Sequence, residues 1–389
     1  MTTFEFSGLT PDQMTLDIST GDVWRSLRKM LSPTFTSGKM KGMLEPMESI
    51  ADRTINHISE QIKTQPNIDV KPIIQGFTLD TISKIGFGVD TNAYKGEDSD
   101  FAKTAADVFD SFRATTWAGT IFFNLFSHLP VLLNYMPIWP ESAFKISKMT
   151  HNIIEDRIKK NIDIGDFIDR LKQVKKNHLE PPLTDGMMDA QGMIFLTAGY
   201  ETTASTLGAM VYELAKNPDV QVRLLEEISS ICESSESINH ENIKDMHLLE
   251  AAIEETLRIR PPVTEHDRVC DKDCEVNGIK IPKGTKIQMY NLASHYNEEF
   301  FPEPHLFKLE RFLKENSDQI IEYTWRPFGG GNRVCIGQRF AIMEMKLFMA
   351  KFITTFKIID IPETKMKYSK GDLFMRFYPD MIVQLEERN

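Results

Sequence analysis

One cysteine of this chain, Cys335, lies in the glycine-rich segment Phe328–Gly337, which reads FGGGNRVCIG. A thiolate there can ligate a metal ion, because glycines without a Cβ leave room for a close approach. Residues 338–348 have helical spacing, and the N–H groups at the start of such a helix would stabilise a negative sulfur. A free structural thiol is the alternative, but the spacing F-x-x-G-x-R-x-C-x-G is hard to meet by chance.

This pattern resembles the haem-binding loop of the cytochrome P-450 family, and the resemblance extends from about residue 20 to the end of the chain. It implies that haem b is the cofactor and that Cys335 is the axial ligand of its iron. A thiolate ligand donates electron density to the iron and favours O–O cleavage. Phe328 and Gly337 would contact the cofactor from the same loop, and Arg333 would pair with a haem propionate.

A second motif, Ala198–Thr203 (AGYETT), lies inside the longest predicted helix, residues 184–216. Glycine inside a helix costs about 0.5–1 kcal/mol relative to alanine, so a compensating role is expected. The motif alone could be an ordinary helix contact, but with the cysteine loop it resembles the oxygen-activation helix of the family. The resemblance implies that Glu201 and Thr202 relay protons and that Ala198 faces the cofactor. The expected substrate contacts are Thr197, Ala198, Val263, Leu373 and Phe374.

Cationic residues from separate segments are expected to hold the propionates. Trp24 and Arg28 share one face of a predicted helix, where a surface arginine over an aromatic ring is the plain alternative. The resemblance assigns both to the propionates, together with Arg268 and Arg333, since guanidinium groups suit carboxylates.

A pair of opposite charges, Glu255 and Arg258, lies at i, i+3 on another predicted helix. The E-x-x-R spacing has little value alone, because it recurs at residues 265–268. In the family the helical pair joins a later arginine, here Arg311, in a structural triad that supports the cysteine loop.

Helical spacing predominates along the chain, with strand signals confined mostly to residues 268–290, where Asn277-Gly278 predicts a hairpin turn. The fold class is therefore mainly α with a small β portion. The resemblance implies the P-450 fold over residues 1–389 as a single domain, with haem between the long central helix and the cysteine loop. The predicted helices are residues 22–31, 43–62, 77–87, 100–112, 142–174, 184–216, 219–232, 248–259 and 338–348.

Composition excludes some classes of function. The net charge of -11 gives no reason to expect nucleic acid as a partner. Four cysteines are too few for a disulfide framework, which favours a reducing, cytosol-facing location, and no C-x-x-C-H motif attaches haem covalently. Ala114–Pro140 contains no Asp, Glu, Lys or Arg and is interrupted by prolines; it is expected to roof the cavity or touch a membrane surface.

The predicted function is a haem-thiolate monooxygenase that inserts one atom of O2 into a lipophilic small molecule. The resemblance is closest to the microsomal clan that metabolises xenobiotics and steroids. It implies electrons from NADPH through NADPH–cytochrome P-450 reductase, cytochrome b5 as a further partner, and the cytoplasmic face of the endoplasmic reticulum.

The start of the chain departs from that clan. Met1–Asp22 shows no membrane anchor, and the first helix and first sheet strands are expected to be missing. The strand at 285–290 would then lack partners. Two alternatives stay open: a truncated haem-binding remnant without turnover, and a haem-thiolate isomerase.

Overall fold

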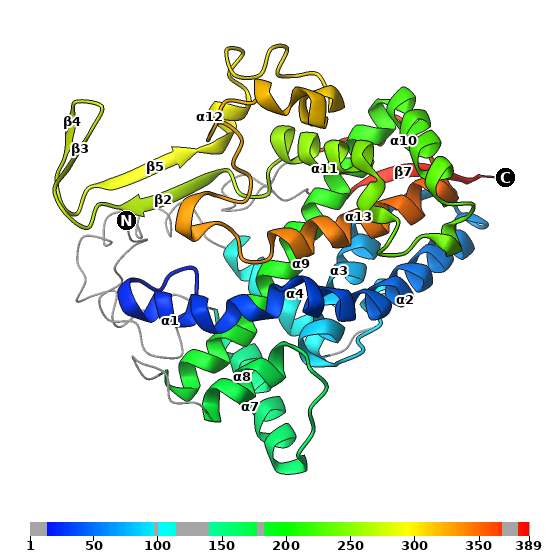
Figure 1. The fold of residues 1–389 in the computed structure, drawn as a ribbon. Coiled ribbons are helices and arrows are strands. Elements are labelled where there is room, and N and C mark those ends of the chain that lie inside the picture. The colour runs from blue at the N-terminus through cyan, green and yellow to red at the C-terminus, as the bar shows by residue number, and fades with distance from the viewer. Residues whose placement is uncertain (1–13, 97–99, 114–139, 177–182, 368–379, 389) are drawn as a thin grey trace.

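The computed structural model describes residues 14–96, 100–113, 140–176, 183–367 and 380–388, and helices dominate them (Figure 1). The prediction of a mainly α protein with a small β portion is confirmed. The helices are α1 (Gly21–Leu31), α2 (Ser37–Ile62), α3 (Val70–Phe87), α4 (Asp100–Arg113), α7 (Glu141–Lys160), α8 (Phe167–Lys176), α9 (Asp185–Lys216), α10 (Pro218–Ile231), α11 (His247–Ile259), α12 (Asn291–His295) and α13 (Gln338–Thr355). The strands are β1 (Asn67–Asp69), β2 (Glu265–Val269), β3 (Cys274–Val276), β4 (Ile279–Ile281), β5 (Lys286–Tyr290), β6 (Phe356–Ile359) and β7 (Ile382–Glu387).

One predicted helix, residues 142–174, is two helices in the structure, α7 and α8. Asn161 ends α7 with a φ of 54°, and Gly165 follows with a φ of 80°. Both residues adopt the left-handed conformation that only glycine and asparagine tolerate well, so the chain turns there instead of continuing. The apolar spacing on both sides concealed this break.

The strands form small antiparallel sheets in the order β1-β7-β6, β2-β5 and β3-β4. The predicted hairpin is confirmed: Asn277 and Gly278 have positive φ and join β3 to β4. The expectation that the strand at 285–290 lacks partners was wrong. That strand, β5, pairs with β2 from Glu265↔Tyr290 to Val269↔Lys286, because β2 begins before the segment that looked strand-like.

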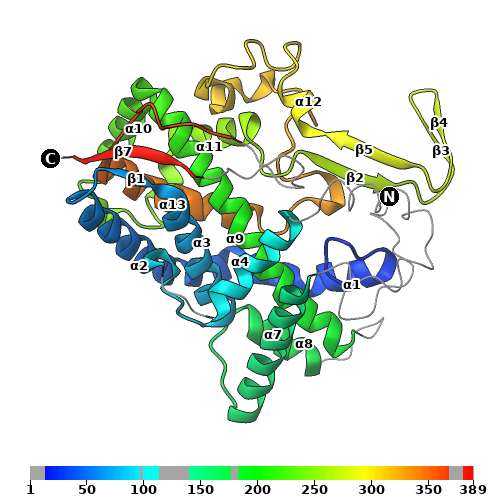
Figure 2. The ribbon, with the colours of Figure 1, turned by 180° about the vertical axis from the view of Figure 1, so that it is seen from behind.

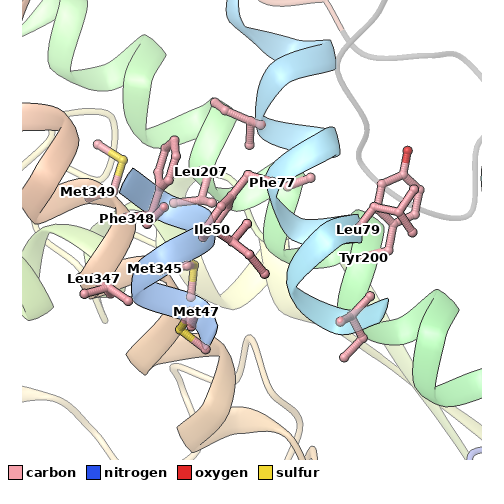
Figure 3. Packing of buried hydrophobic residues seen from close by; sticks show 14 of the residues in the cluster. Met47, Ile50, Phe77, Leu79, Tyr200, Leu207, Met345, Leu347, Phe348 and Met349 are labelled. Atoms are coloured by element: carbon pink, nitrogen blue, oxygen red, sulfur yellow. The ribbon is translucent and has the colours of Figure 1, made fainter. Parts of the chain in front are cut away.

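The long helix α9 runs through the middle of the molecule (Figures 1 and 2). It begins where the Thr184 hydroxyl accepts a hydrogen bond from Met187 N and ends at Asn217, before Pro218. Apolar side chains of α2, α3 and α13 pack beside it, with Phe77 and Phe348 at a ring-centroid distance of 4.4 Å (Figure 3). This core fixes α13, and therefore the loop before it, relative to α9.

A carboxylic acid, Glu344 of α13, is buried in this core with no accessible surface. Among the described residues neither of its oxygens has a hydrogen-bond partner, and the Thr81 hydroxyl of α3 also lacks one. Burial raises the pKa of Glu344 well above its ordinary value. Burial therefore favours the protonated form of this acid in the folded protein.

We predict that Glu344→Gln removes a pH-dependent loss of stability. Below the unfolded pKa both states hold the proton, so pH has no effect through this group. Above it the unfolded state releases the proton first, and the free energy of unfolding falls by up to about 1.4 kcal/mol per pH unit until the folded pKa is reached. Urea titrations from pH 4.5 to 9 should show a smaller fall for the variant. The exposed control Glu60→Gln should leave the slope unchanged, and an equal slope for Glu344→Gln would refute the assignment.

Candidate active site

A cavity of about 500 Å³ lies between α9 and the loop that carries Cys335. Its volume is in the range of sites that enclose a small organic ligand or cofactor. The other walls come from α1 and from the segment that leads into β2. Residues separated by more than 300 positions in sequence, such as Trp24 and Cys335, therefore share one site.

The cysteine loop is a closed turn. Cys335 N donates to Phe328 O at 2.9 Å, and inside it Gly329 N donates to Arg326 O at 3.0 Å. Gly329 and Gly331 have φ of 76° and 65°, which a side chain would strain. The glycines thus allow the tight turn that presents Cys335 at the cavity wall.

Cys335 lines the cavity and is exposed there, although many protein atoms surround its sulfur. Burial raises the pKa of its thiol, while the N–H groups of Gly337 and Gln338 and the Arg28 guanidinium act in the opposite direction. Gln338 is the first residue of α13, so its helix start faces the sulfur as the sequence predicted. The site thus offers three partners to a thiolate.

The guanidinium groups of Arg28, Arg268 and Arg333 converge on one end of the cavity. Burial lowers the pKa of all three, and Arg268 and Arg28 lower that of Arg333 further, to about 10, against an opposing effect of the Asp17 carboxyl. In the part of the chain that the structure describes, none of the three forms an ion pair with a carboxylate. Mutually repelling, partly desolvated cations favour an anionic ligand.

Each of these cations has a fixed position. Arg28 Nη1 donates to Val334 O at 2.8 Å, next to the cysteine. Arg333 donates to Ser19 O at 2.7 Å, and its guanidinium lies 4.5 Å from the centre of the Trp24 ring. The structure therefore brings together the predicted set Trp24, Arg28, Arg268 and Arg333.

One face of α9 forms the opposite wall. Ala198, Thr202 and Thr206, four residues apart, line the cavity. The Thr202 hydroxyl donates to Ala198 O at 2.6 Å and is open to the cavity. Gly199 also borders the cavity, but its missing Cβ has another reason, since that atom would lie 2.7 Å from Ile82 Cδ1 of α3. The glycine thus serves the close contact between α3 and α9.

Two predicted residues lie off the cavity wall. The carboxylate of Glu201 accepts from Gln75 Nε2 of α3 at 2.9 Å and from Ser205 Oγ at 3.4 Å, and the side chain is buried. Thr197 is also buried and donates to Met193 O at 3.0 Å. Val263 lines the cavity as expected, whereas Leu373 and Phe374 lie outside the described residues.

The predicted triad is assembled beneath the site. Arg258 donates to both carboxylate oxygens of Glu255, at 2.7 and 2.8 Å, and both side chains are fully buried. Arg311 Nε reaches the same carboxylate at 3.4 Å, and Lys308 N donates to it at 2.9 Å.

A histidine that the sequence analysis missed joins this triad to the cysteine loop. His295 is fully buried; its Nδ1 lies 3.0 Å from Arg258 O, and its Nε2 accepts from Arg326 N at 3.2 Å. Burial lowers the pKa of His295 to about 4, so it is neutral at physiological pH. A proton on Nδ1 and a lone pair on Nε2 satisfy both contacts.

Two further cavity residues had no strong sequence signal. Asp17 precedes α1, and burial raises the pKa of its carboxyl. His266 of β2 lies 3.1 Å from Arg326 O. By contrast Gln191, two helical turns before Ala198, could have been found from the periodicity of the cavity face of α9.

These surfaces fit a haem group. A thiol and a wall of small residues face each other across the cavity, its remaining lining is largely apolar, and its cationic end matches two carboxylates. The fit rests on the donor set and on the cations that no carboxylate of the described chain neutralises. The arrangement is that of a haem-thiolate protein.

Comparison with known proteins agrees with this class of protein. The family model "Cytochrome P450" matches residues 3–382. Similar relatives are cytochrome P450 3A29 of Sus scrofa, 31% identical over 90% of this chain and 71% of its own length, and cytochrome P450 3A11 of Mus musculus, 32% identical over 94% and 74%. The chain belongs to the cytochrome P450 family and is a P450 monooxygenase.

We predict that Glu255→Gln destabilises the protein strongly, although the new side chain has nearly the same shape. It leaves the Arg258 charge buried without its partner, which typically costs about 3–5 kcal/mol. Urea unfolding should detect this loss. Asp156→Ala, which breaks an exposed pair with Lys160, should cost less than about 1 kcal/mol. Similar losses for the two variants would show that the buried pair does not support the fold.

Proposed function

We propose that this chain binds haem b through Cys335 and oxidises a lipophilic small molecule in the cavity beneath α9. The observation that carries the proposal is the convergence of the Cys335 thiol, the cations and the small residues of α9 on one cavity. The apolar remainder of the lining suits a lipophilic substrate, for which Val263 is a contact. Residues 1–389 would act as a single domain.

The protein's own groups have distinct roles in this proposal. When bound, the haem supplies the activation of O2 and the insertion of one oxygen atom. Cys335 Sγ would hold the iron, and Phe328 would exclude water from the sulfur. Arg28, Arg268 and Arg333 bind the propionates, with Trp24 supporting Arg333 through its ring. Ala198 leaves space at the cavity wall.

Proton delivery would pass through the Thr202 hydroxyl, which borders the cavity. Its proton is held on Ala198 O, so its lone pairs are available to accept a hydrogen bond from a donor in the cavity. Glu201 would resupply this hydroxyl only after its carboxylate has taken up a proton and left Gln75. We therefore assign Thr202 the first position in the relay and Glu201 the second.

Electrons would come from NADPH through NADPH–cytochrome P-450 reductase, with cytochrome b5 as a second partner. Exposed cations on α1, α2 and the start of α13 support an acidic donor: Lys29, Lys39, Lys41 and Arg339. Arg339 also donates to Ser37 Oγ, which ties the start of α13 to α2 on this surface.

We place the protein at the cytoplasmic face of the endoplasmic reticulum, by analogy with the family. The segment proposed to touch the membrane, Ala114–Pro140, lies almost wholly outside the described residues. Within the part of the chain that is described, no helix has the length and hydropathy needed to span a bilayer.

We predict that the reduced, haem-loaded protein gives the red-shifted carbon monoxide band of a thiolate-ligated haem. Cys335→Ala should abolish the band because no other described thiol lines the cavity. The control Cys232→Ala removes a buried thiol elsewhere and should keep the band. Persistence of the band in Cys335→Ala would refute the ligand assignment. A band without product from any lipophilic substrate would favour the truncated haem-binding remnant without turnover. Rearrangement of a substrate without O2 uptake would favour the haem-thiolate isomerase.

Thr202→Ala is expected to keep the carbon monoxide band and to uncouple turnover. Loss of a positioned proton donor should lower the product formed per NADPH severalfold or more. Thr202→Ser, which keeps a hydroxyl, should restore most of the coupling. Parallel measurement of NADPH consumption and product tests this, and normal coupling in Thr202→Ala would remove the relay from the proposal.

A further inference from the structure

Two cysteines outside the haem cavity lie close together at the end of β2. Cys270 follows β2 directly, and Cys274 is the first residue of β3. Their Sγ atoms are 3.5 Å apart, and the Cys270 thiol donates to Lys272 O at 2.9 Å. The proposed function uses neither side chain.

The backbone holds both cysteines in place. Cys270 N donates to Thr285 O at 2.9 Å, and Cys270 O accepts from Gly284 N at 2.7 Å. Cys274 lies opposite Ile281 in the β3–β4 pair. A disulfide needs a sulfur separation of about 2.05 Å, so the two atoms must approach by about 1.5 Å, which side-chain rotation can supply.

Access differs between the two thiols. The β3–β4 hairpin protrudes from the helical body (Figures 1 and 2), and Cys274 is partly exposed while Cys270 is buried. An oxidant in solution therefore reaches Cys274 first, with Cys270 poised beside it. Cys232 is buried and Cys335 faces the cavity, so neither has this arrangement.

We propose that Cys270 and Cys274 form a reversible thiol–disulfide modification site that is closed by hydrogen peroxide. The Cys274 thiolate attacks one peroxide oxygen; an S–O bond forms, the O–O bond breaks and hydroxide leaves. The Cys270 thiolate then attacks Cys274 Sγ, forming the S–S bond and expelling a second hydroxide. The two thiol protons convert both hydroxides to water, so two thiols are oxidised as one peroxide is reduced.

Both sulfurs are free thiols in the structure. The hydrogen bond with Cys270 raises the pKa of Cys274, and burial and Asp271 add to this shift, against Lys272. The disulfide would close a five-residue loop at the corner where the β2–β5 ladder passes into the β3–β4 hairpin. It would stiffen the end of the strand that carries Arg268.

The test uses the full haem-loaded chain treated with hydrogen peroxide, quenched with an alkylating reagent and digested with trypsin. Cleavage after Arg268, Lys272 and Lys280 separates the two cysteines, so the disulfide would link peptides 269–272 and 273–280. We expect this linked pair, and its separation by dithiothreitol. The extent of methionine oxidation in the same sample measures the dose of hydrogen peroxide that the protein received.

Matched variants keep the result decisive. Cys270→Ser should drive Cys274 to sulfinic and sulfonic acids, because its resolving thiol is gone. Cys232→Ser should leave the linked pair unchanged, and the haem absorbance checks that each variant is folded. Reduced cysteines at doses that oxidise methionines, overoxidation of Cys274 with Cys270 still present, or disulfide-linked dimers would each overturn the proposal.

Discussion

The buried ion pair between Glu255 and Arg258 is the interaction on which the site depends. Two ions without solvent are costly to bury, and here carbonyl groups give the arginine further partners: Arg258 also donates to His295 O at 2.8 Å and to Leu306 O at 3.3 Å. Through neutral His295 the pair reaches Arg326 N, the residue that closes the turn under Cys335. A chain of directional hydrogen bonds therefore sets the position of the sulfur. Apolar packing alone, which is not directional, would allow the loop to shift.

Whereas the ion pair joins opposite charges, the cationic end of the cavity places like charges close together. Arg28, Arg268 and Arg333 repel one another, and their lowered pKa values show that burial penalises each charge. Contacts with carbonyl groups fix their positions without neutralising them. A ligand with two carboxylates relieves this repulsion, so binding free energy and fold stability are linked at this end.

Much of this could be predicted from sequence where a local pattern had one physical cause. The turn at Cys335 and the extent of α9 followed from spacing, and the pairing of Glu255 with Arg258 followed from the family resemblance. His295 did not, because its two partners come from distant segments and no motif surrounds it. The pairing of β5 with β2 was not predicted either, because strand partners depend on tertiary contacts that spacing within one strand does not reveal.

The placement of Glu201 shows why a motif alone does not assign roles. Successive residues of a helix point about 100° apart, so Ala198–Thr203 cannot all face one cavity. Thr202 faces the cofactor side, whereas Glu201 and the Cα of Gly199 face α3, where Gln75 and Ile82 meet them. The motif therefore encodes two interfaces of α9 at once. Its glycine sets the distance between the helices, and its threonine borders the chemistry.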